Sequence, residues 1–520
     1  MKNLPLSTIV LLLFFQFSNA QQQTAVEYYQ NPVIAGDFPD PTVIRVGDTY
    51  YAAGTSSDFA PNYPLYESTD LINWKHIGHI FNEPPDWTSK NFWAPELYYM
   101  NGTFYVYYTA KRKGDHVSCI GVATTTDIRK GFTDHGIIIE WGKEAIDAFV
   151  FRDDDDKLYI SWKAYGLTEG RPIELLCSEL SQDGLELVGE HFTLTDHSKG
   201  WQGAGDEGQC LVKHGDYYYH LYSVGGCCDN RCDYQVMVAR STELRGDWEQ
   251  YPEPILQGGE NWKCTGHGTL VSTPDNRYFY LYHSYHATDF EYIGRQGLLD
   301  ELVWDEQTDW PKLRQGTTAS VKAPVPFAGT SQKRETTIID NFSSDISVKL
   351  WQWDLNLPKP AFKIAKGELV LSGTAKGLGF LGMRPRVGNY AMTTEVSNRS
   401  DAAKGICIYG NHQNYLAFGC HSTGLVIFQV ASGKRTELAT IATAENKPFY
   451  LKVEVQNGRY YRFFWSEDQT VWVPFGSADD FTVDGKFLPQ WGVAQRAGLF
   501  VEGDDSATGR FLELKFEYQF

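Results

Sequence analysis

Four carboxylates and one imidazole recur at similar distances before five similar turns of the chain. They lie 9, 7, 10, 9 and 10 residues before the third residue of their turns, and they are Asp40, Glu96, Asp147, Glu207 and His267. Carboxylates that are brought together repel one another, so their pKa values split, and one site can then hold an acid and a base at neutral pH. Hydrolysis of a glycosidic bond needs such a pair, because one carboxyl group protonates the leaving oxygen while a carboxylate activates water or attacks the sugar. One ionisable residue near a strand end is ordinary on a surface, but five at matching offsets predict a shared site.

The turns themselves form an internal repeat over residues 30 to 310. Each copy is a polar turn followed by a strand rich in Tyr and Phe, and the third residues of the copies are 54, 54, 59 and 61 positions apart. These third residues are Thr49, Thr103, Lys157, Asp216 and Arg277. Aromatic strands separated by turns at this period are typical of four-stranded propeller blades. We therefore predict an all-β chain in which residues 21–321 form a five-bladed β-propeller, and the first strand of each blade lines a central channel where the five side chains converge.

Beyond the repeat, the sequence predicts a second domain. Residues 322–338 have the Pro, Gly and polar content of a linker. Residues 339–520 contain several segments of alternating character, which indicate an antiparallel β-sandwich. These segments are 367–372, 390–396, 425–430, 450–455 and 511–518.

The first 20 residues have the features of a signal peptide. Lys2 supplies a positive start, Ile9 to Phe15 form a short apolar run, and Ser18-Asn19-Ala20 offers small residues for cleavage. The apolar run is too short to cross a bilayer, and no later segment is long and apolar enough to do so. We expect an exported protein, periplasmic or secreted, with no membrane insertion.

The charge balance argues against one class of binding partner. The chain has 46 basic and 65 acidic residues, a formal charge of −19. Nucleic acid needs a basic footprint, so this balance argues against it and suits a neutral substrate. Aromatic residues make up 15% of the chain and suit both sheet packing and stacking on sugar rings, so composition alone does not separate the two uses.

Nine cysteines leave at least one free thiol or an intermolecular bond. Cys227, Cys228 and Cys232 share one Gly-rich loop, with Cys264 downstream. A zinc site would need finger-type His/Cys spacing, which is missing, so we favour a local disulfide whose pairing the sequence leaves open. A loop stiffened in this way, just downstream of Glu207, would close one end of a pocket and admit only a terminal sugar. The alternative is a disulfide that merely stabilises an exposed blade edge.

An ordered set of short motifs across residues 30 to 320 resembles glycoside hydrolase family 43. The set runs Asn31-Pro32, Asp40-Pro41, Trp93-Ala94-Pro95-Glu96, Ile146-Asp147-Ala148-Phe149, Glu207-Gly208, Gly266-His267-Gly268 and Arg295-Gln296-Gly297. Trp351-Gln352-Trp353 followed by Pro358 resembles the concanavalin-like C-terminal domain of some pentose-releasing members. That domain would bind polysaccharide or support the propeller and shape its pocket, and we favour the supporting role.

The resemblance implies an inverting glycosidase with defined residue roles. Asp40 would be the general base, Glu207 the general acid, and Asp147 the residue that tunes the acid's pKa and orients it. Arg295 would bind a sugar hydroxyl or form a salt bridge between blades, and Trp93 would wall the sugar pocket or pack between blades. His267 would face a structural calcium ion in the channel or be a hydrogen-bonded buried histidine, and no cofactor is required for the reaction itself.

These observations lead to one main functional interpretation and two alternatives. We expect an exo-acting α-L-arabinofuranosidase that acts on plant cell-wall polysaccharide or oligosaccharide, because the loop Pro61-Asn62-Tyr63-Pro64 departs from the Pro-Gly-x-Pro pattern associated with xylosidases. The alternative within the class is a β-D-xylosidase, since the two pentoses present similar hydroxyls. A non-catalytic glycan-binding protein is the alternative from another class. The presence of Asp40, Asp147 and Glu207 together argues against it, because binding alone requires no acid–base pair.

Overall fold

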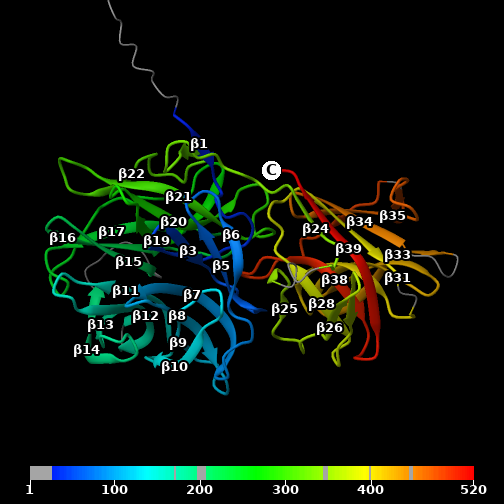
Figure 1. The fold of residues 1–520 in the computed structure, drawn as a ribbon, viewed down its shortest axis with the longest axis horizontal. Coiled ribbons are helices and arrows are strands. Elements are labelled where there is room, and N and C mark those ends of the chain that lie inside the picture. The colour runs from blue at the N-terminus through cyan, green and yellow to red at the C-terminus, as the bar shows by residue number, and fades with distance from the viewer. Residues whose placement is uncertain are drawn as a thin grey trace, which may run out of the picture.

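The computed structural model describes residues 26–168, 171–195, 206–343, 349–397, 400–443, 449–478 and 480–520, which form two all-β halves side by side (Figure 1). The N-terminal half is coloured blue to green and the C-terminal half yellow to red. The described residues contain no α-helix. Within them, no helix has the length and apolar character that a membrane crossing requires. The predicted signal peptide, residues 1–20, lies outside the described residues.

The N-terminal half contains five four-stranded antiparallel sheets, each built from strands that are neighbours in sequence, except that β4 is left out of the first. The first blade is β2 (Thr42–Val46), β3 (Thr49–Ala53), β5 (Asn62–Ser68) and β6 (Lys75–Phe81). The second is β7 (Thr88–Met100), β8 (Thr103–Arg112), β9 (Ser118–Thr125) and β10 (Thr133–Ile139). The third is β11 (Glu144–Arg152), β12 (Leu158–Thr168), β13 (Arg171–Leu180) and β14 (Leu187–Thr195). The fourth is β15 (Glu207–His214), β16 (Tyr217–Val224), β17 (Gln235–Ser241) and β18 (Glu249–Gln250), and the fifth is β19 (Trp262–Ser272), β20 (Tyr278–His286), β21 (Arg295–Trp304) and β22 (Pro311–Leu313).

The five sheets close into a ring around their first strands. Strand β2 contacts β7, β7 contacts β11, β11 contacts β15, β15 contacts β19, and β19 returns to β2. Each repeated turn joins the first and second strands of a blade, as the sequence predicts. The five-bladed β-propeller is thus confirmed, and its first strands form the inner ring.

The N-terminal segment ties the ring together. Strand β1 (Tyr28–Gln30) pairs with β23 (Lys322–Pro324), which follows the last blade. The Asn31 side-chain amide donates to the carbonyls of Leu299 and Ser320, both beyond the start of the fifth blade. The first three residues of the predicted linker therefore belong to the propeller half.

The C-terminal half is a sandwich of two antiparallel sheets. One sheet has the order β26 (Phe362–Ala365), β27 (Glu368–Ser372), β39 (Thr508–Tyr518), β29 (Tyr390–Val396), β34 (Phe449–Gln456), β35 (Tyr460–Ser466) and β36 (Val473–Phe475), with β24 (Thr337–Asp340) on β39 and β37 (Val483–Asp484) on β35. The other has the order β28 (Leu378–Met383), β38 (Arg496–Glu502), β30 (Lys404–Asn411), β31 (Asn414–His421), β32 (Gly424–Ala431) and β33 (Lys434–Ala442). In β34 every second side chain from Phe449 to Val455 is buried, because successive strand residues face opposite sides of a sheet. All five segments predicted from alternation coincide with these strands, apart from Gly367, which directly precedes β27.

The two halves are joined by backbone pairing and buried charge. Strand β4 (Phe59–Ala60) of the propeller pairs with β25 (Trp353–Asp354) of the sandwich. Arg496 of β38 lies 3.1 Å from the Asp37 carboxylate, and both side chains are buried. Asp37 is three residues before Asp40, so the sandwich contacts the segment that carries the predicted base.

Candidate active site

A β-bulge interrupts the inner strand of blades two to five at the site. The register shifts between Trp93 and Glu96, between Ile146 and Phe149, between Glu207 and Cys210, and between Gly266 and Thr269. A residue with positive φ lies in each bulge, and a fifth lies just before β2; they are Asp40 (52°), Ala94 (37°), Asp147 (58°), Gly208 (59°) and His267 (43°). A bulge bends a strand and re-aims a side chain. The bulges therefore explain how residues of a central strand turn into the channel.

The positions of the five predicted residues within their bulges show that they are only roughly equivalent. Asp147 and His267 occupy the positive-φ place in their own bulges, and Asp40 has the same conformation before β2. Glu207 comes one residue before its equivalent, Gly208, and Glu96 comes two residues after Ala94. The common offset from the turns is therefore approximate.

Asp40 is buried and surrounded by donors and cations. Its carboxylate lies 2.8 Å from Arg295 Nη1 and accepts a 2.7 Å hydrogen bond from Thr55 Oγ1. His267 Nδ1 and His283 Nδ1 lie 3.5 and 3.2 Å from the same carboxylate. Burial raises the pKa of Asp40, but Arg295, His267 and His283 outweigh burial and hold it well below the ordinary range. Asp40 is therefore an ionised carboxylate, the state that a general base needs.

His267 connects Asp40 to Asp147. Its Nδ1 atom lies 3.5 Å from Asp40 Oδ1 and 4.0 Å from Asp147 Oδ2. The backbone N–H of His267 donates to Ser223 Oγ at 2.8 Å, and a Cβ added to Gly208 would lie 2.6 Å from the imidazole ring. The ring is thus fixed against the Gly208 bulge with Nδ1 directed at two carboxylates.

Glu207, which is partly buried, forms an ion pair with the buried Lys163. Lys163 Nζ lies 2.7 Å from Glu207 Oε2, and the Tyr234 hydroxyl donates to Oε1 at 2.9 Å. Burial raises the pKa of Glu207, but the Lys163 ammonium, with His267 and the Tyr234 hydrogen bond, lowers it below the ordinary value. Glu207 therefore carries negative charge while Lys163 stays beside it.

Asp147 has the opposite electrostatic balance. Burial, followed by the charges of Glu207 and Asp40, raises its pKa to about 7, although His267 and Lys163 oppose the shift. Its backbone carbonyl accepts a 2.6 Å hydrogen bond from the Gln209 side chain. Asp147 and Glu207 together therefore keep one proton below about pH 7, and Asp147 holds it in the unliganded protein.

Glu96 is separate from this arrangement. Its carboxyl group accepts a hydrogen bond from Thr42 Oγ1 at 2.7 Å and another from the Val150 backbone at 3.4 Å. Burial raises its pKa to about 8. Glu96 is a neutral buried acid at pH 7 that links the inner strands of the first three blades.

The other predicted residues lie in two different settings. Arg295, predicted to bind a sugar hydroxyl or to form a salt bridge between blades, is buried on the fifth blade and pairs with Asp40 at the start of the first, so the salt bridge between blades is observed. Trp93 is half-buried and has no aromatic ring partner among the described residues. Its neighbour Ala94 donates its N–H to Thr55 Oγ1 at 2.7 Å, the hydroxyl that in turn binds Asp40. The structure thus links Asp40, Asp147, Glu207, His267 and Arg295 by direct contacts or charge, with Trp93 at their edge.

Four residues at the site were not singled out from the sequence: Thr55, Lys163, Tyr234 and His283. Lys163 is a lone cation within an apolar strand, and a buried lysine needs a carboxylate partner. That signal could have identified it. Tyr234 and His283, whose rings stack at 5.7 Å, are two among many aromatic and histidine residues of the blades, so their types alone carry no signal.

The described contacts of His267 favour the alternative of a histidine held by neighbouring side chains over a contact with calcium. Calcium takes six to eight oxygen ligands, whereas His267 directs a ring nitrogen at two carboxylates that Arg295 and Lys163 already help to neutralise. The part of the chain that the structure describes has no group of three or more His, Cys, Asp or Glu side chains arranged to hold a metal ion. No step below depends on a metal.

The cysteine-rich loop lies directly beside the site. Cys227 bonds to Cys228, and Cys232 bonds to Cys264 of β19, three residues before His267. The other five cysteines are buried free thiols. Tyr234, the last residue of the loop, donates its hydroxyl hydrogen bond to Glu207. The Cys228 carbonyl accepts a hydrogen bond of 3.1 Å from the N–H of Gly492 in the sandwich. The predicted local cross-link is present, because the Cys232–Cys264 disulfide ties the loop to the inner strand β19, while the hydrogen bond with Gly492 ties it to the second domain.

Known proteins share this fold and this arrangement of domains. The family described as "Glycosyl hydrolases family 43" matches residues 29–311, and "Beta xylosidase C-terminal Concanavalin A-like domain" matches residues 339–501. A xylan 1,3-beta-xylosidase from Vibrio sp is 26% identical over 86% of this chain and 90% of its own, and a non-reducing end alpha-L-arabinofuranosidase from Bacteroides ovatus is 25% identical over 76% and 75%. A family 43 protein from Bacillus licheniformis has a solved structure with a TM-score of 0.81, at 23% identity over 95% of this chain and 100% of its own, which shows the fold. With more than half of its length matched by the catalytic family, this chain belongs to glycosyl hydrolase family 43.

Proposed function

We propose that this glycosidase is an exo-acting, inverting α-L-arabinofuranosidase in which Asp40 is the general base, Glu207 the general acid and Asp147 the residue that tunes the acid. The observation that carries the proposal is the division of protonation states among three buried carboxylates. Cations hold Asp40 ionised, whereas the pKa of Asp147 is raised to about 7, so one proton stays beside Glu207 at mildly acidic pH. A base and a proton donor on one ring are what inverting hydrolysis requires.

In the proposed reaction, Asp40 takes a proton from a water molecule as the water oxygen attacks the anomeric carbon. Glu207 donates a proton to the departing glycosidic oxygen on the opposite side of the sugar, and the C–O bond breaks. The released pentose has inverted anomeric configuration, and proton exchange with solvent restores both carboxyl groups. Because Glu207 is ion-paired with Lys163 in the unliganded protein, the proton held by Asp147 must reach Glu207 before the acid step.

The exo mode rests on the loop from Gly225 to Tyr234. The Cys232–Cys264 disulfide, the Tyr234 hydrogen bond to Glu207 and the contact with Gly492 hold this loop beside Glu207, which supports a pocket closed at one end. Incubation with a linear arabinan oligosaccharide should give free arabinose from the first time point. Internal fragments at early times would contradict the exo mode. Cys228→Ser with Cys232→Ser should loosen the selectivity for a terminal sugar without removing hydrolysis.

The sugar is assigned to arabinofuranose from the loop Pro61–Pro64. Asn62 is fully buried there, and its amide donates to Ser56 Oγ, next to the Thr55 that binds Asp40. The residue that replaces the glycine of the xylosidase pattern thus contacts the segment beside the base. β-D-Xylosidase is the second candidate, since the Vibrio relative and the domain matched at residues 339–501 both carry that name. A comparison of kcat/KM on aryl α-L-arabinofuranoside and aryl β-D-xyloside decides between them.

Substrate source and location follow from the same proposal. We expect plant cell-wall polysaccharides or their oligosaccharides as substrates, hydrolysed outside the cytoplasm. An extracellular exo-alpha-(1->5)-L-arabinofuranosidase from Cellvibrio japonicus, 28% identical over 53% of this chain and 86% of its own, supports the location. Activity that stays with the cytoplasmic fraction of a fractionated culture would contradict the location.

We also propose that catalysis requires no metal ion. Arg295 and Lys163 already supply positive charge to Asp40 and Glu207. Dialysis against EDTA should leave kcat unchanged. Loss of activity that calcium alone restores would assign the ion a role at the channel.

A further inference from the structure

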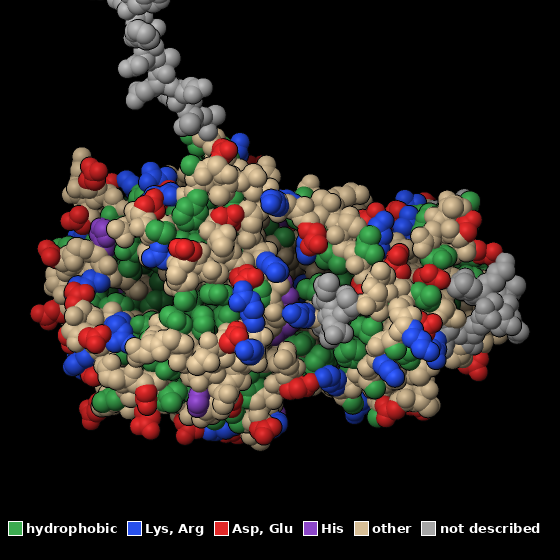
Figure 2. All heavy atoms as spheres, viewed as in Figure 1, with side chains coloured by type: hydrophobic (Ala, Val, Ile, Leu, Met, Phe, Trp, Pro, Cys, Tyr) green, Lys and Arg blue, Asp and Glu red, His purple; other side chains and the backbone are tan. Residues whose placement is uncertain are grey.

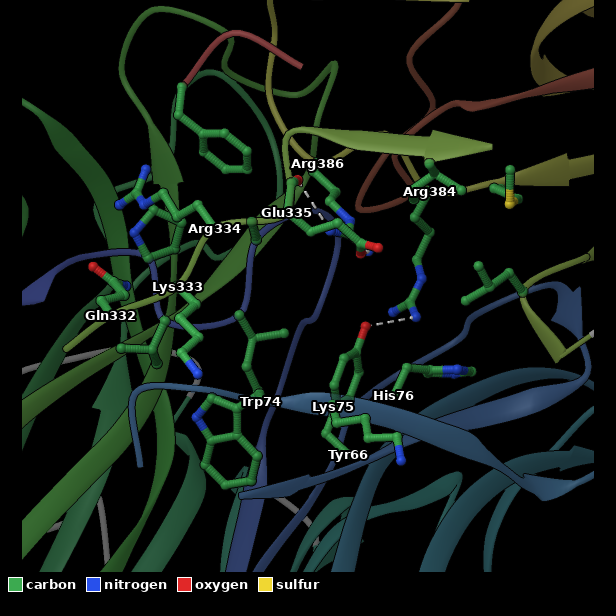
Figure 3. A pocket seen from close by; sticks show the side chains of 18 of the residues that line it. Tyr66, Trp74, Lys75, His76, Gln332, Lys333, Arg334, Glu335, Arg384 and Arg386 are labelled. Carbon is green, nitrogen blue, oxygen red and sulfur yellow. Dashed lines mark hydrogen bonds and ion pairs between the residues drawn. The ribbon is translucent and has the colours of Figure 1, made fainter. Parts of the chain in front are cut away.

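A cavity of about 840 Å³ lies between the two halves, and none of the three catalytic carboxylates lines it. Its walls are β5 and β6 of the first blade, the segment 32–35, the linker residues 332–335 and the end of β28 with Arg384 and Arg386 (Figure 3). This volume is within the range of about 300–1,000 Å³ typical of ligand pockets. The cavity is therefore large enough for several sugar units.

The lining of this cavity has the opposite charge to the whole chain. It includes one side-chain carboxylate, Glu335, and six cationic side chains, which are Lys75, Lys333, Arg334, Lys349, Arg384 and Arg386. The chain as a whole has a formal charge of −19. Lys and Arg side chains also gather along the boundary between the halves in the space-filling view (Figure 2). Such a local reversal needs an explanation other than composition.

Most of these cations lack an acidic partner. Arg386 pairs with Glu335 at 2.7 Å, and Lys75, at 3.9 Å from Glu67, is mostly exposed. For the other four, no carboxylate of the described residues lies within ion-pair distance. The positive charge of these side chains also acts on His76, which lines the cavity as well. Burial lowers the pKa of His76 to about 3, and Arg384, Lys349 and Arg386 contribute to that shift.

The geometry of Arg384 is fixed before any ligand arrives. Its Nη1 donates to the Asp37 carbonyl at 2.8 Å, and its Nη2 donates to the Tyr66 hydroxyl at 3.1 Å. Figure 3 shows the side chain extending from the sandwich to Tyr66 of the propeller. A guanidinium held in place loses little entropy when it binds a carboxylate.

Aromatic rings accompany the cations. Trp74 lines the cavity and is half-buried, whereas Trp248, at the matching place of the fourth blade, is buried at 8% exposure. Tyr66 and the 45% exposed Phe520 add two further rings. Apolar ring surface beside fixed cations suits a ligand that has both an apolar face and a negative charge.

We propose that this interdomain cavity binds a short oligosaccharide that carries a uronic acid, with the carboxylate held by cationic side chains of the lining and a sugar ring against Trp74. An inorganic anion would not use the rings or the volume. A long polyanion would be repelled by the net charge of the protein. The site is separate from the hydrolytic one, so it would hold an acidic branch of the glycan on the protein while a terminal neutral sugar is removed elsewhere.

The test measures binding, so it does not depend on which pentose is released. The protein used throughout is the full-length Glu207→Gln variant, which carries the further substitutions below. Its binding is measured by calorimetric titration at low ionic strength. The ligands are xylotriose that carries one glucuronic acid, plain xylotriose, and sodium sulfate. We expect the acidic oligosaccharide to bind at least about tenfold more tightly than the other two. Lys75→Glu with Lys333→Glu, two exposed positions, should abolish the difference. Trp74→Ala should weaken the binding of the acidic oligosaccharide but leave the binding of sulfate unchanged.

The control is Lys434→Glu on β33, an exposed lysine outside the cavity with the same change of charge. It should keep the preference for the acidic sugar. Equal affinity for the charged and neutral oligosaccharides would overturn the proposal. So would a preference that survives the double charge reversal, or sulfate binding as tight as that of the acidic oligosaccharide.

Discussion

Three carboxylates of similar burial differ in protonation because each has a different set of neighbours. Asp40 has Arg295 at 2.8 Å, and Glu207 has Lys163 at 2.7 Å. Asp147 has no ion pair with Lys or Arg among the described residues, and its pKa is raised to about 7. The protonation of the three carboxylates thus depends on two buried cations, Arg295 and Lys163, as much as on the acids themselves.

Replacing either catalytic carboxylate should remove most activity and leave the fold intact. Asp40→Asn and Glu207→Gln each remove an acid–base group worth about 10²–10⁴-fold in rate. The matched control is Glu96→Gln, because Glu96 is already neutral at pH 7 and accepts the Thr42 hydroxyl hydrogen bond, which a carboxamide oxygen can also accept. We expect kcat of this variant to stay within a few-fold of wild type. A catalytic variant that retained a tenth of wild-type kcat, with native circular dichroism, would contradict the assigned roles.

The pH dependence should show the proton shared by Asp147 and Glu207. Since Asp40 stays ionised in mild acid and the pair loses its proton near pH 7, kcat/KM should be high from about pH 4 to 7 and should fall above that range. Lys163→Met removes the cation that lowers the pKa of Glu207, so the alkaline limb should move up by about one pH unit.

The comparison variant for this shift is Lys213→Met, at the other end of β15. Lys213 pairs with Asp154 at 2.6 Å and lies outside the site. It should have the wild-type pH profile. If Lys163→Met folds but its kcat/KM falls at the same alkaline pH as that of the wild type, the ion pair with Glu207 does not determine the pKa of the proton shared with Asp147.

The acids were predictable from sequence, but the pairing of each acid with its cation or hydroxyl was not. Asp40, Asp147 and Glu207 repeat with the blades, so an internal comparison finds them. Lys163 and Tyr234 occur at one blade each, and their meaning depends on strands that come together only in the ring. Arg295 illustrates the same limit, because the sequence leaves open a sugar-hydroxyl ligand and a salt bridge between blades, and its partner Asp40 is 255 residues away.

At the scale of elements, the repeated turns determine the blades, but the bulges determine the site. Turn chemistry is local, so the five hairpins follow from short polar runs. A bulge depends on pairing with the second strand of the blade, and among the five positive-φ residues only Gly208 adopts this conformation without a steric cost. The blade architecture was therefore predictable, whereas the one- and two-residue offsets of Glu207 and Glu96 were not.

The bulge at Gly208 should tolerate no side chain. A Cβ there would meet the His267 ring at 2.6 Å, and φ of +59° is unfavourable for alanine. Gly208→Ala should displace His267 from the catalytic carboxylates and lower kcat at least about tenfold, with a loss of stability of about 1–3 kcal/mol. Gly215→Ala, in the exposed turn of the same hairpin, has a similar φ of +58° and open space at Cβ. It should cost stability but not kcat, and equal kcat losses in the two variants would contradict the argument.

At the scale of the whole molecule, the sandwich is part of the support of the active site. Arg496 of the sandwich is 1% exposed and pairs with Asp37, while Arg384 donates to the Asp37 carbonyl. The next residue, Phe38, donates its N–H to the Arg295 carbonyl, and Arg295 holds Asp40. A continuous set of contacts thus runs from the second domain to the base, which supports the role of the sandwich as a support for the propeller.

Removing the Arg496 charge should therefore affect both stability and catalysis. Arg496→Met leaves Asp37 buried without its ion-pair partner, which typically costs about 3–5 kcal/mol, so the melting temperature should fall. At 25 °C, with the variant still folded, we expect kcat to fall about tenfold, because a shift of the Asp37–Asp40 segment moves the base away from Arg295. Arg510→Met, in the same domain, removes an exposed pair with Glu368 and should change neither quantity. If Arg496→Met melts earlier but hydrolyses aryl glycoside at the wild-type kcat, the interface stabilises the protein without positioning Asp40, and the proposed link between the domains is wrong.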